Sequence, residues 1–173
     1  MTRRLVRLRR HLHWWTAALV IIGFAIAWLM TALPVSVLLV KFLLYQLHKS
    51  LGLCVAGLAA VRLVLAWRAG DRPRGLPAAL YGLLLLVPLL GYLTAAASPT
   101  AVPTLFFLVL KVPHVIAPDQ GVFEVIGPVH KWLAIGLVGL AGWHASQMRF
   151  GASGSRRLRM ARSEDAHPPA KPG

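Results

Sequence analysis

Apolar residues along the chain gather in blocks of about twenty, separated by short polar or basic stretches. The hydrocarbon core of a bilayer is about 30 Å thick and takes a helix of about 20 apolar residues, so each block predicts one membrane-spanning helix. Pro34 ends the first block, and the polar turn 68–75 separates the second from the third. We therefore expect an all-α fold, a transmembrane four-helix bundle with spans at about 13–33, 45–67, 77–97 and 129–148.

Three segments do not fit a simple span. The second apolar run, 35–67, is too long for one crossing at about 1.5 Å per residue, so its first part, with Lys41 and Gln46, is expected at or beyond the outer surface. The connection 98–128 contains five prolines, and we expect only a short interfacial helix over 101–112. The basic, proline-rich end predicts a transmembrane domain over 1–150 and a disordered tail over 151–173.

The charge distribution predicts the topology. The chain is 57% hydrophobic with a net charge of +14, and its basic residues cluster beside the apolar blocks. A soluble protein this basic would suggest nucleic acid, but this placement indicates membrane lipid as the partner and no nucleic acid. Cytoplasmic loops carry an excess of Lys and Arg, so both termini are expected in the cytoplasm. The residues predicted on that side are Arg3, Arg4, Arg7, Arg9, Arg10, Arg68, Arg72, Arg74, Arg149, Arg156, Arg157, Arg159, Arg162 and Lys171.

An Arg-rich start before an apolar run is also typical of a secretory signal peptide. The run that follows here is long, and it has no convincing small-x-small cleavage site. We therefore expect an uncleaved first span.

Four histidines lie at matched depths in these blocks. His130 and His144 are fourteen residues apart, which on one helix is a rise of about 21 Å and nearly four turns, so they share a face. His13 opens the first span level with His144, and His48 opens the embedded part of the second span level with His130. The expected pairs are His13 with His144 on the inner side and His48 with His130 on the outer side.

Two imidazoles from different helices can hold one haem iron in a bundle core, so the pairs predict two stacked haems. A single histidine in a span is often only a hydrogen-bonded group at a helix contact, but paired depths favour a cofactor. Zinc or copper is disfavoured because no carboxylate or thiolate lies near the pairs. Other histidines and the lone cysteine give no such signal; these are His11, His114, His167 and Cys54.

Three basic residues are candidates for contact with the haems. Arg62 lies fourteen residues after His48, hence on nearly the same face at the inner end, where it can pair with a propionate or snorkel to lipid phosphate. Lys49 and Lys131 each follow an outer histidine and can neutralise propionates, attract an anion or simply lie at the interface. No nucleophile triad or paired carboxylates are present, so any catalytic residues are unknown.

Several motifs carry a family resemblance over about residues 7–150. They are His13-Trp14, His48-Lys-Ser-Leu-Gly-Leu53, Pro88-Leu-Leu-Gly91, and His130 with His144. In these the chain resembles the bacterial cytochrome b561 family. The resemblance implies four transmembrane helices, two b-type haems ligated by the four histidines, and electron transfer between ubiquinone or another quinone and a second donor or acceptor.

The resemblance leaves three functions open. The chain can be a di-haem electron carrier working with a redox protein partner. It can be an enzyme, a superoxide oxidase that passes electrons from superoxide at the outer haem to ubiquinone. It can also be the haem-bearing membrane anchor of a larger oxidoreductase, such as a hydrogenase or formate dehydrogenase. The outer connection matches no pattern of the family, so the outer partner is left open.

Overall fold

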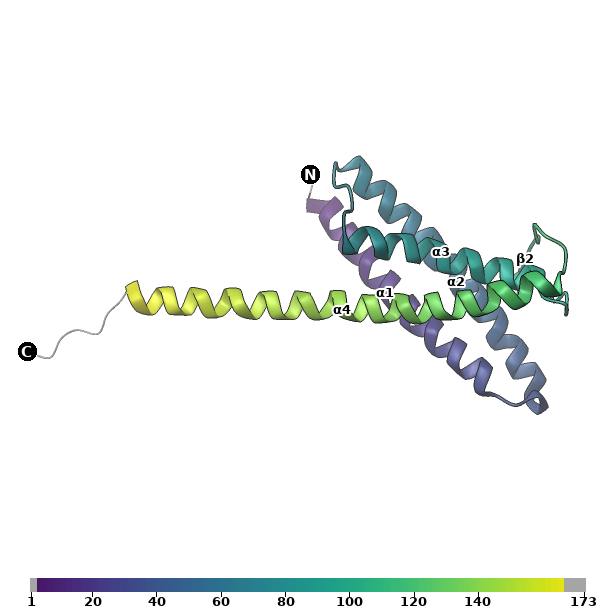
Figure 1. The fold of residues 1–173 in the computed structure, drawn as a ribbon. Helices are drawn as coiled ribbons and strands as arrows, with labels where there is room; N and C mark the ends of the chain where they lie inside the picture. The colour runs from purple at the N-terminus through teal and green to yellow at the C-terminus, as the bar shows by residue number, and fades with distance from the viewer. Residues whose placement is uncertain (1–2, 167–173) are drawn as a thin grey trace, which may run out of the picture. The chain divides into compact units, whose positions relative to one another are not determined.

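The computed structural model describes residues 3–166, and their side chains up to residue 147. The chain divides into two compact units, Met1–Val138 and Gly139–Gly173, and each is described by itself. The elements, drawn in Figure 1, are α1 (Arg3–Ala32), the short 3-10 helix η1 (Val35–Val37), α2 (Leu38–Arg68), α3 (Leu76–Ala97), β1 (Thr104–Phe106), β2 (Leu110–Val112) and α4 (Gln120–Ala166).

The prediction of an all-α membrane fold is confirmed. Within the described residues, four helices are long and apolar enough to cross a membrane: Arg3–Ala32, Val35–Arg68, Leu76–Ala97 and Gln120–Gln147. The third agrees closely with the expected span, while the second begins well before the expected residue 45. The side on which each terminus lies stays a prediction. We call the end of the helices that bears the 98–119 connection the outer end, following that predicted topology.

Polar groups inside the helices are satisfied locally, as a bilayer requires. The hydroxyl of Thr16 donates to the carbonyl of Leu12 at 2.6 Å, and that of Thr94 donates to Leu90 at 2.8 Å. Among the described residues, every buried side-chain nitrogen or oxygen has a hydrogen-bond partner. The buried polar side chains of these helices therefore need no water to satisfy them.

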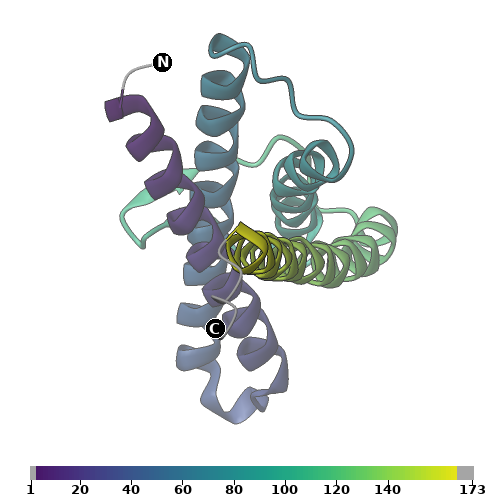
Figure 2. The same cartoon turned by 90° about the vertical axis from the view of Figure 1, so that its left-hand side faces the viewer.

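A tight connection joins α1 to α2. Pro34 adopts an extended conformation that ends α1, and η1 turns the chain back. Lys41 Nζ donates to the carbonyl of Leu33 at 3.0 Å, which satisfies one of the orphan acceptors at the end of α1. The two helices then run antiparallel and side by side (Figure 2).

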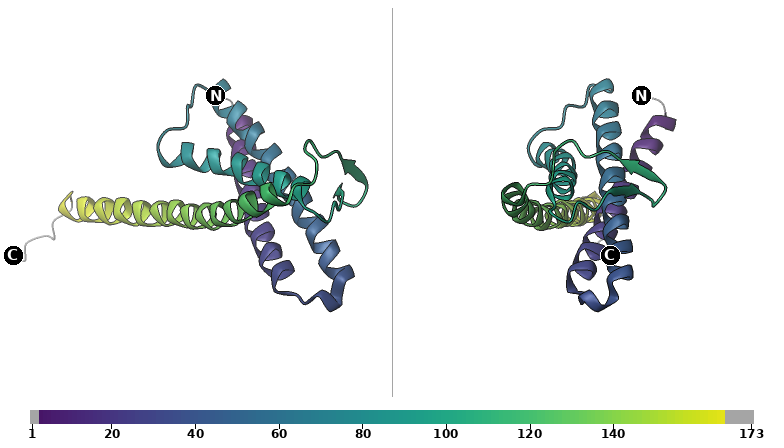
Figure 3. Two further views of the ribbon diagram at one scale, coloured as in Figure 1. Left: turned by 45° about the vertical axis from the view of Figure 1, so that its right-hand side comes forward. Right: turned by 90° about the vertical axis from the view of Figure 1, so that its right-hand side faces the viewer.

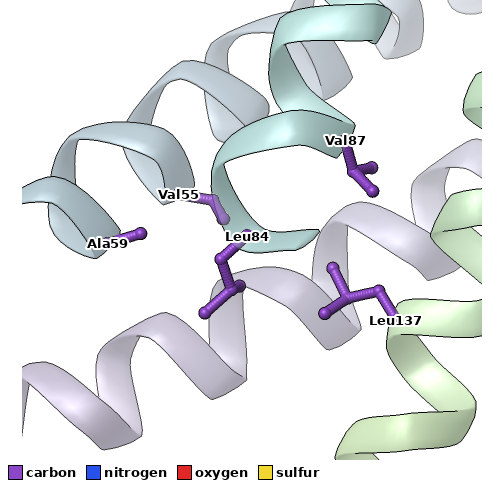
Figure 4. Close-up of a cluster of buried hydrophobic side chains, with 5 residues drawn as sticks. All are labelled: Val55, Ala59, Leu84, Val87 and Leu137. Carbon is purple, nitrogen blue, oxygen red and sulfur yellow. The ribbon is translucent and has the colours of Figure 1, made fainter. Parts of the chain in front are cut away.

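The core of the first unit is a small cluster where α2, α3 and the start of α4 meet. Val55 and Ala59 of α2 pack with Leu84 and Val87 of α3 and with Leu137 of α4 (Figure 4). Ala59 is completely buried, because a small side chain lets neighbouring helices approach closely. This packing holds α2, α3 and α4 at the depth where the histidines lie.

The tryptophans face outward. All six are between 60% and 72% exposed: Trp14, Trp15, Trp28, Trp67, Trp132 and Trp143. Tryptophan is enriched at the two surfaces of a bilayer, where its apolar ring and polar N–H are both accommodated. On α1, Trp14 and Trp28 are separated by a rise of about 21 Å. Their exposure supports the placement of these helices in a membrane.

The outer connection contains a β-hairpin, so the short helix expected over 101–112 was wrong. Thr104 pairs with Val112 and Phe106 pairs with Leu110 in an antiparallel register, and Figure 3 shows the hairpin beside α2. Phe107 and Leu108 make the turn with positive φ angles of 46° and 63°. The residue before a proline avoids the helical region, and prolines at 103 and 113 flank a segment rich in apolar residues that favour strands.

The last helix also differs from expectation. α4 continues to Ala166, although its predicted span ended near residue 148 and a disordered tail was expected after residue 150. The segment 151–166 contains four Arg and three Ala, which favour helix, and no proline. The rest of the expected tail, 167–173, lies outside the described residues, and a domain boundary at 150 stays a prediction.

Candidate functional site

His48 of α2 and His130 of α4 lie face to edge inside the first unit. Their ring centroids are 6.2 Å apart, and the ring planes are inclined by 77°. Both side chains are half-buried. The structure therefore brings together the two residues that the sequence placed at one depth.

Each of these rings is held by a backbone carbonyl. His48 Nδ1 lies 3.0 Å from the carbonyl oxygen of Gly23 on α1, and His130 Nδ1 lies 2.9 Å from that of Val87 on α3. A carbonyl only accepts, so Nδ1 donates in both contacts and the lone pair of each neutral ring is on Nε2. Metal-binding histidines commonly donate their other N–H to a carbonyl in this way. Both rings are thus prepared to bind a metal through Nε2.

Gly91 gives His130 the space it needs. A Cβ atom at this glycine would lie 2.8 Å from Cε1 of His130 and 3.2 Å from its Nδ1. Any side chain here would push the ring away from the carbonyl of Val87, one turn earlier on α3. The Pro88-Leu-Leu-Gly91 motif was visible in the sequence, but only the structure shows which ring its glycine contacts.

The pair lies well inside the helices and not at their ends. α2 begins at Leu38, about 15 Å before His48, and α1 continues about 13 Å beyond Gly23. α3 likewise continues about 15 Å beyond Val87. The apolar helix begins ten residues before His48. That His48 opens the embedded part of its span stays a prediction.

The β-hairpin is fixed to α2 next to His48. The Gln46 amide accepts from the backbone N–H of Leu105 at 3.0 Å and donates to the carbonyl of Pro103 at 2.9 Å. The hydroxyl of Ser50 accepts from the N–H of Phe107 at 2.8 Å. Gln46 is 1% exposed and Ser50 is fully buried. Their side chains make hydrogen bonds to the backbone of the hairpin that a neighbouring strand would otherwise make. We call this set of contacts the hairpin clamp.

The geometry of a helix places the clamp behind His48. Gln46 and Ser50 are one turn apart and share a face of α2, whereas His48 is two residues from each and points to the opposite face. The hairpin therefore packs on one side of α2 and His130 on the other. Sequence reasoning missed both clamp residues; the available signal was two polar residues at i and i+4 inside an apolar run.

A second group of residues gathers around His13 on α1. Arg62 Nη2 donates to His13 Nδ1 at 3.0 Å, and the guanidinium carbon lies 5.2 Å from the centroid of the Tyr81 ring. Arg9 also pairs with Asp71 at 2.7 Å. A pocket of 390 Å³ opens here and is lined by Val6, Arg9, Arg10, His13, Arg62 and Tyr81. Arg62 thus lies beside the inner histidine, in a cluster that is strongly cationic.

The neutral His13 ring carries its proton on the opposite nitrogen from the rings of His48 and His130. A guanidinium only donates, so Nδ1 of His13 accepts, and the proton of the neutral ring is on Nε2. Binding of a metal through Nε2 therefore requires Arg62 to leave Nδ1. Here the arrangement differs from His48 and His130, which need no such change.

The other candidate residues are His144, Lys49 and Lys131. His144 is half-buried in the second unit, and its pairing with His13 stays a prediction. Lys49 is half-buried and Lys131 is exposed. Within the described part of the chain no three His, Cys, Asp or Glu residues gather as a metal cage.

Comparison with known families agrees with this geometry. The family model of prokaryotic cytochrome b561 matches residues 6–162. The chain belongs to the prokaryotic cytochrome b561 family. No curated protein sequence matches it significantly. This cytochrome is therefore a multi-pass membrane protein that binds haem b and transfers electrons.

The residues of the first pair fit a haem. A metal–imidazole bond is about 2 Å long, so two imidazoles on opposite sides of one metal have ring centroids roughly 6 Å apart. The separation of 6.2 Å between His48 and His130 agrees with this arrangement. The two Nδ1–carbonyl contacts of the cytochrome also leave the nitrogen with the lone pair for iron.

The hairpin clamp generates a first prediction. Gln46→Leu keeps the size of the side chain but leaves the N–H of Leu105 and the carbonyl of Pro103 without their partner, at a cost of about 1–3 kcal/mol. Amide hydrogen exchange in a peptide covering 101–112 should then be about tenfold faster or more. Gln120→Leu, an exposed position at the start of α4, is the control. Unchanged exchange in Gln46→Leu would show that the clamp does not hold the hairpin.

Proposed function

We propose that this cytochrome carries two b haems and moves electrons between the quinone pool and a donor or acceptor at the outer face. The outer haem is held by His48 and His130, and the inner haem by His13 and His144. The observation that carries the proposal is the His48–His130 pair, with its 6.2 Å separation and both Nδ1 atoms on carbonyls.

Bound haem supplies an iron that accepts and returns one electron at a time. His48 and His130 would both hold the iron and would leave no open position on it for oxygen or substrate. A reaction partner must therefore exchange electrons from outside the ligand set. The protein contributes position, electrostatics and exclusion of water.

The surrounding residues determine how firmly the outer ligands are held. The carbonyls of Gly23 and Val87 orient the two rings and raise their basicity as ligands. Gly91 keeps the space against His130 open. The hairpin clamp fixes the face of α2 opposite His48 and keeps water from that side.

At the inner site we assign Arg62 a role with a haem propionate. A carboxylate in the pocket formed with Arg9 and Arg10 attracts the guanidinium of Arg62 by a charge-assisted hydrogen bond. When Arg62 leaves Nδ1 of His13, the ring can carry its proton there and offer Nε2 to iron. Lys49 and Lys131, each adjacent to an outer ligand, serve the outer propionates. Both termini lie in the cytoplasm, on the side of the basic clusters.

A second candidate function is superoxide oxidation at the outer haem, with ubiquinone as the final acceptor. The supporting observation is a group of positive charges at the outer connection. Lys49 and Lys111 both act electrostatically on His114, next to the segment that carries His48. Such a cluster attracts a small anion and raises its rate of encounter.

The four ligands are tested by haem content. The purified wild-type protein in detergent should contain two haems b per chain. His48→Ala or His130→Ala should remove the outer haem, and His13→Ala or His144→Ala the inner one, so each variant keeps about half, because one imidazole cannot hold a low-spin haem alone. Pyridine haemochrome quantitation and dithionite-reduced spectra measure this. His11→Ala, at an exposed position, should keep both haems. Equal haem content in all variants would refute the assignment.

The glycine against His130 has a matched control on the same helix. Gly91→Ala places a methyl group 2.8 Å from the imidazole, so the ring must turn away and the outer haem should be lost or become high-spin. Gly82→Ala meets no atom within 4 Å and should leave the spectrum unchanged. Magnetic circular dichroism or low-temperature EPR of both variants tests this. Two normal low-spin haems in Gly91→Ala would show that contact with this glycine is dispensable.

The superoxide candidate is tested with the oxidised protein and enzymatically generated superoxide. Reduction of the haems at a near diffusion-limited rate, abolished by superoxide dismutase, is the expected result because the outer charges steer the anion. The rate should fall as ionic strength rises. If superoxide leaves the haems oxidised, this second function is excluded and the carrier function is unaffected.

A further inference from the structure

The turn of the β-hairpin carries four consecutive apolar side chains that are open to the surroundings. Phe107, Leu108, Val109 and Leu110 are 47%, 51%, 89% and 63% exposed. No charged residue occurs in 101–110. A contiguous apolar patch on the surface of a protein often marks a site of contact with a membrane or with another protein. We call these four residues the hairpin tip.

The backbone of the turn keeps these bulky residues at a conformational cost. The carbonyl of Phe106 accepts from the N–H of Val109 at 3.1 Å, and both residues between them have positive φ angles, 46° at Phe107 and 63° at Leu108. Turns of this kind strongly favour Asn-Gly, because a Cβ atom crowds the backbone in the left-handed region. The turn therefore retains Phe and Leu against its own backbone preference, which indicates a use for their side chains other than folding.

The hairpin clamp sets the depth of the hairpin along α2. Gln46 and Ser50 bind β1, and Leu47 lies between them on the helix. Leu47 is exposed and continues a stripe with Val40 and Leu43, which are exposed as well. These three residues share a face of a helix that is long and apolar enough to cross a membrane, so the stripe faces lipid. The hairpin therefore lies at the depth of a lipid-facing stripe.

The hairpin lies on the outside of the helices. β1 packs against α2, on the side of α2 away from α3 (Figures 2 and 3). The rest of the outer connection returns to the other helices: the hydroxyl of Tyr92 donates to the carbonyl of Pro113, and the N–H of Asp119 donates to that of Ala97. The surroundings of the hairpin tip are therefore those of the outward face of α2, which is lipid in a membrane protein.

The open edge of β2 limits how deeply the hairpin enters. In the described part of the chain the sheet consists of β1 and β2, and the hairpin clamp binds the β1 side. Backbone groups at an open edge need water or headgroups, because hydrocarbon leaves them unsatisfied. Lys111, exposed on β2 beside the tip, can lay its stem on apolar residues while its ammonium group reaches phosphate. Both features favour the boundary between headgroups and acyl chains.

We propose that the hairpin tip inserts into the bilayer at the headgroup–acyl boundary of the outer end and anchors the outer connection to lipid. The tip is continuous with the lipid-facing surface of α2, and its apolar composition matches acyl chains. A second copy or a partner protein fits less well, because a stable protein interface involves about 20–30 residues a side and the tip has few. The anchor does not depend on how many haems the cytochrome binds.

Spin labels in lipid nanodiscs test the depth of the tip. Val109→Cys, in a Cys54→Ala background, carries a nitroxide in nanodiscs of phosphatidylethanolamine and phosphatidylglycerol. Power saturation compares collisions with oxygen, which concentrates in acyl chains, and with a water-soluble nickel chelate. The oxygen-to-nickel ratio should be about threefold higher or more than for Thr100→Cys, an exposed polar position, and should approach that of lipid-facing Leu43→Cys. A ratio equal to that of Thr100→Cys, or exclusion of both reagents by contact with protein, would overturn the proposal.

Replacing the turn by Asn-Gly separates the anchor from folding. Phe107→Asn with Leu108→Gly suits the positive φ angles but removes two apolar side chains. Hydrogen-exchange protection of the peptide 101–112 in detergent should be kept or improved, whereas the Val109→Cys label in nanodiscs should lose about threefold or more of its oxygen-to-nickel ratio. Val115→Ala, an exposed position outside the tip, is the control. A label that stays in lipid, or weaker protection in detergent, would show that Phe107 and Leu108 are not the anchor.

Discussion

The structure around the functional site depends on two hydrogen bonds between imidazole Nδ1 atoms and backbone carbonyls. One joins His48 of α2 to Gly23 of α1, and the other joins His130 of α4 to Val87 of α3. Each bond therefore fixes a side chain of one helix against the backbone of another. The His48–His130 contact joins α2 to α4, so the three contacts together connect all four helices. In a bilayer, where helix contact gains little from the hydrophobic effect, such polar contacts and close packing position the helices. The proposed haem ligands are thus also part of what holds the helices together.

The sequence predicted the number of spanning helices, which the thickness of the bilayer determines, and the residues that share a depth or a face, which the helix period determines. Apolar blocks of fixed length gave four helices because a hydrocarbon core sets that length, and α3 has nearly the predicted bounds. The meeting of His48 with His130 followed from their matched depths. The fourteen residues from His48 to Arg62 placed Arg62 at the inner end of α2, because a helix turns by a constant angle, but its contact with His13 was not predicted. Predictions of this kind use only the helix geometry and require no information on side-chain packing.

The sequence did not predict contacts in which the backbone is a partner. The carbonyls of Gly23 and Val87 have no side-chain signature, and Gly91 looks like any other helix glycine until the His130 ring is placed beside it. The hairpin was missed for the same reason. The strand β1 pairs on one side with β2 and on the other with the side chains of Gln46 and Ser50, which are more than fifty residues away in the chain. Only the fold shows that two polar residues in an apolar helix serve as a substitute strand.

The surroundings of His48 and His130 differ from those of His13 in a way that bears on how the cytochrome binds haem. The carbonyls that hold His48 and His130 belong to helix backbones and cannot exchange for another partner, so both rings have Nε2 ready before any iron arrives. His13 is held by the side chain of Arg62, in a pocket with two further arginines. Its Nδ1 accepts a hydrogen bond, whereas the Nδ1 atoms of His48 and His130 donate one. Under the proposed assignment, the His13 ring can bind iron only when an anion draws Arg62 away, which the propionates of haem itself can do. The proposed outer site would then be preorganised, whereas the proposed inner site would be completed by the cofactor it binds.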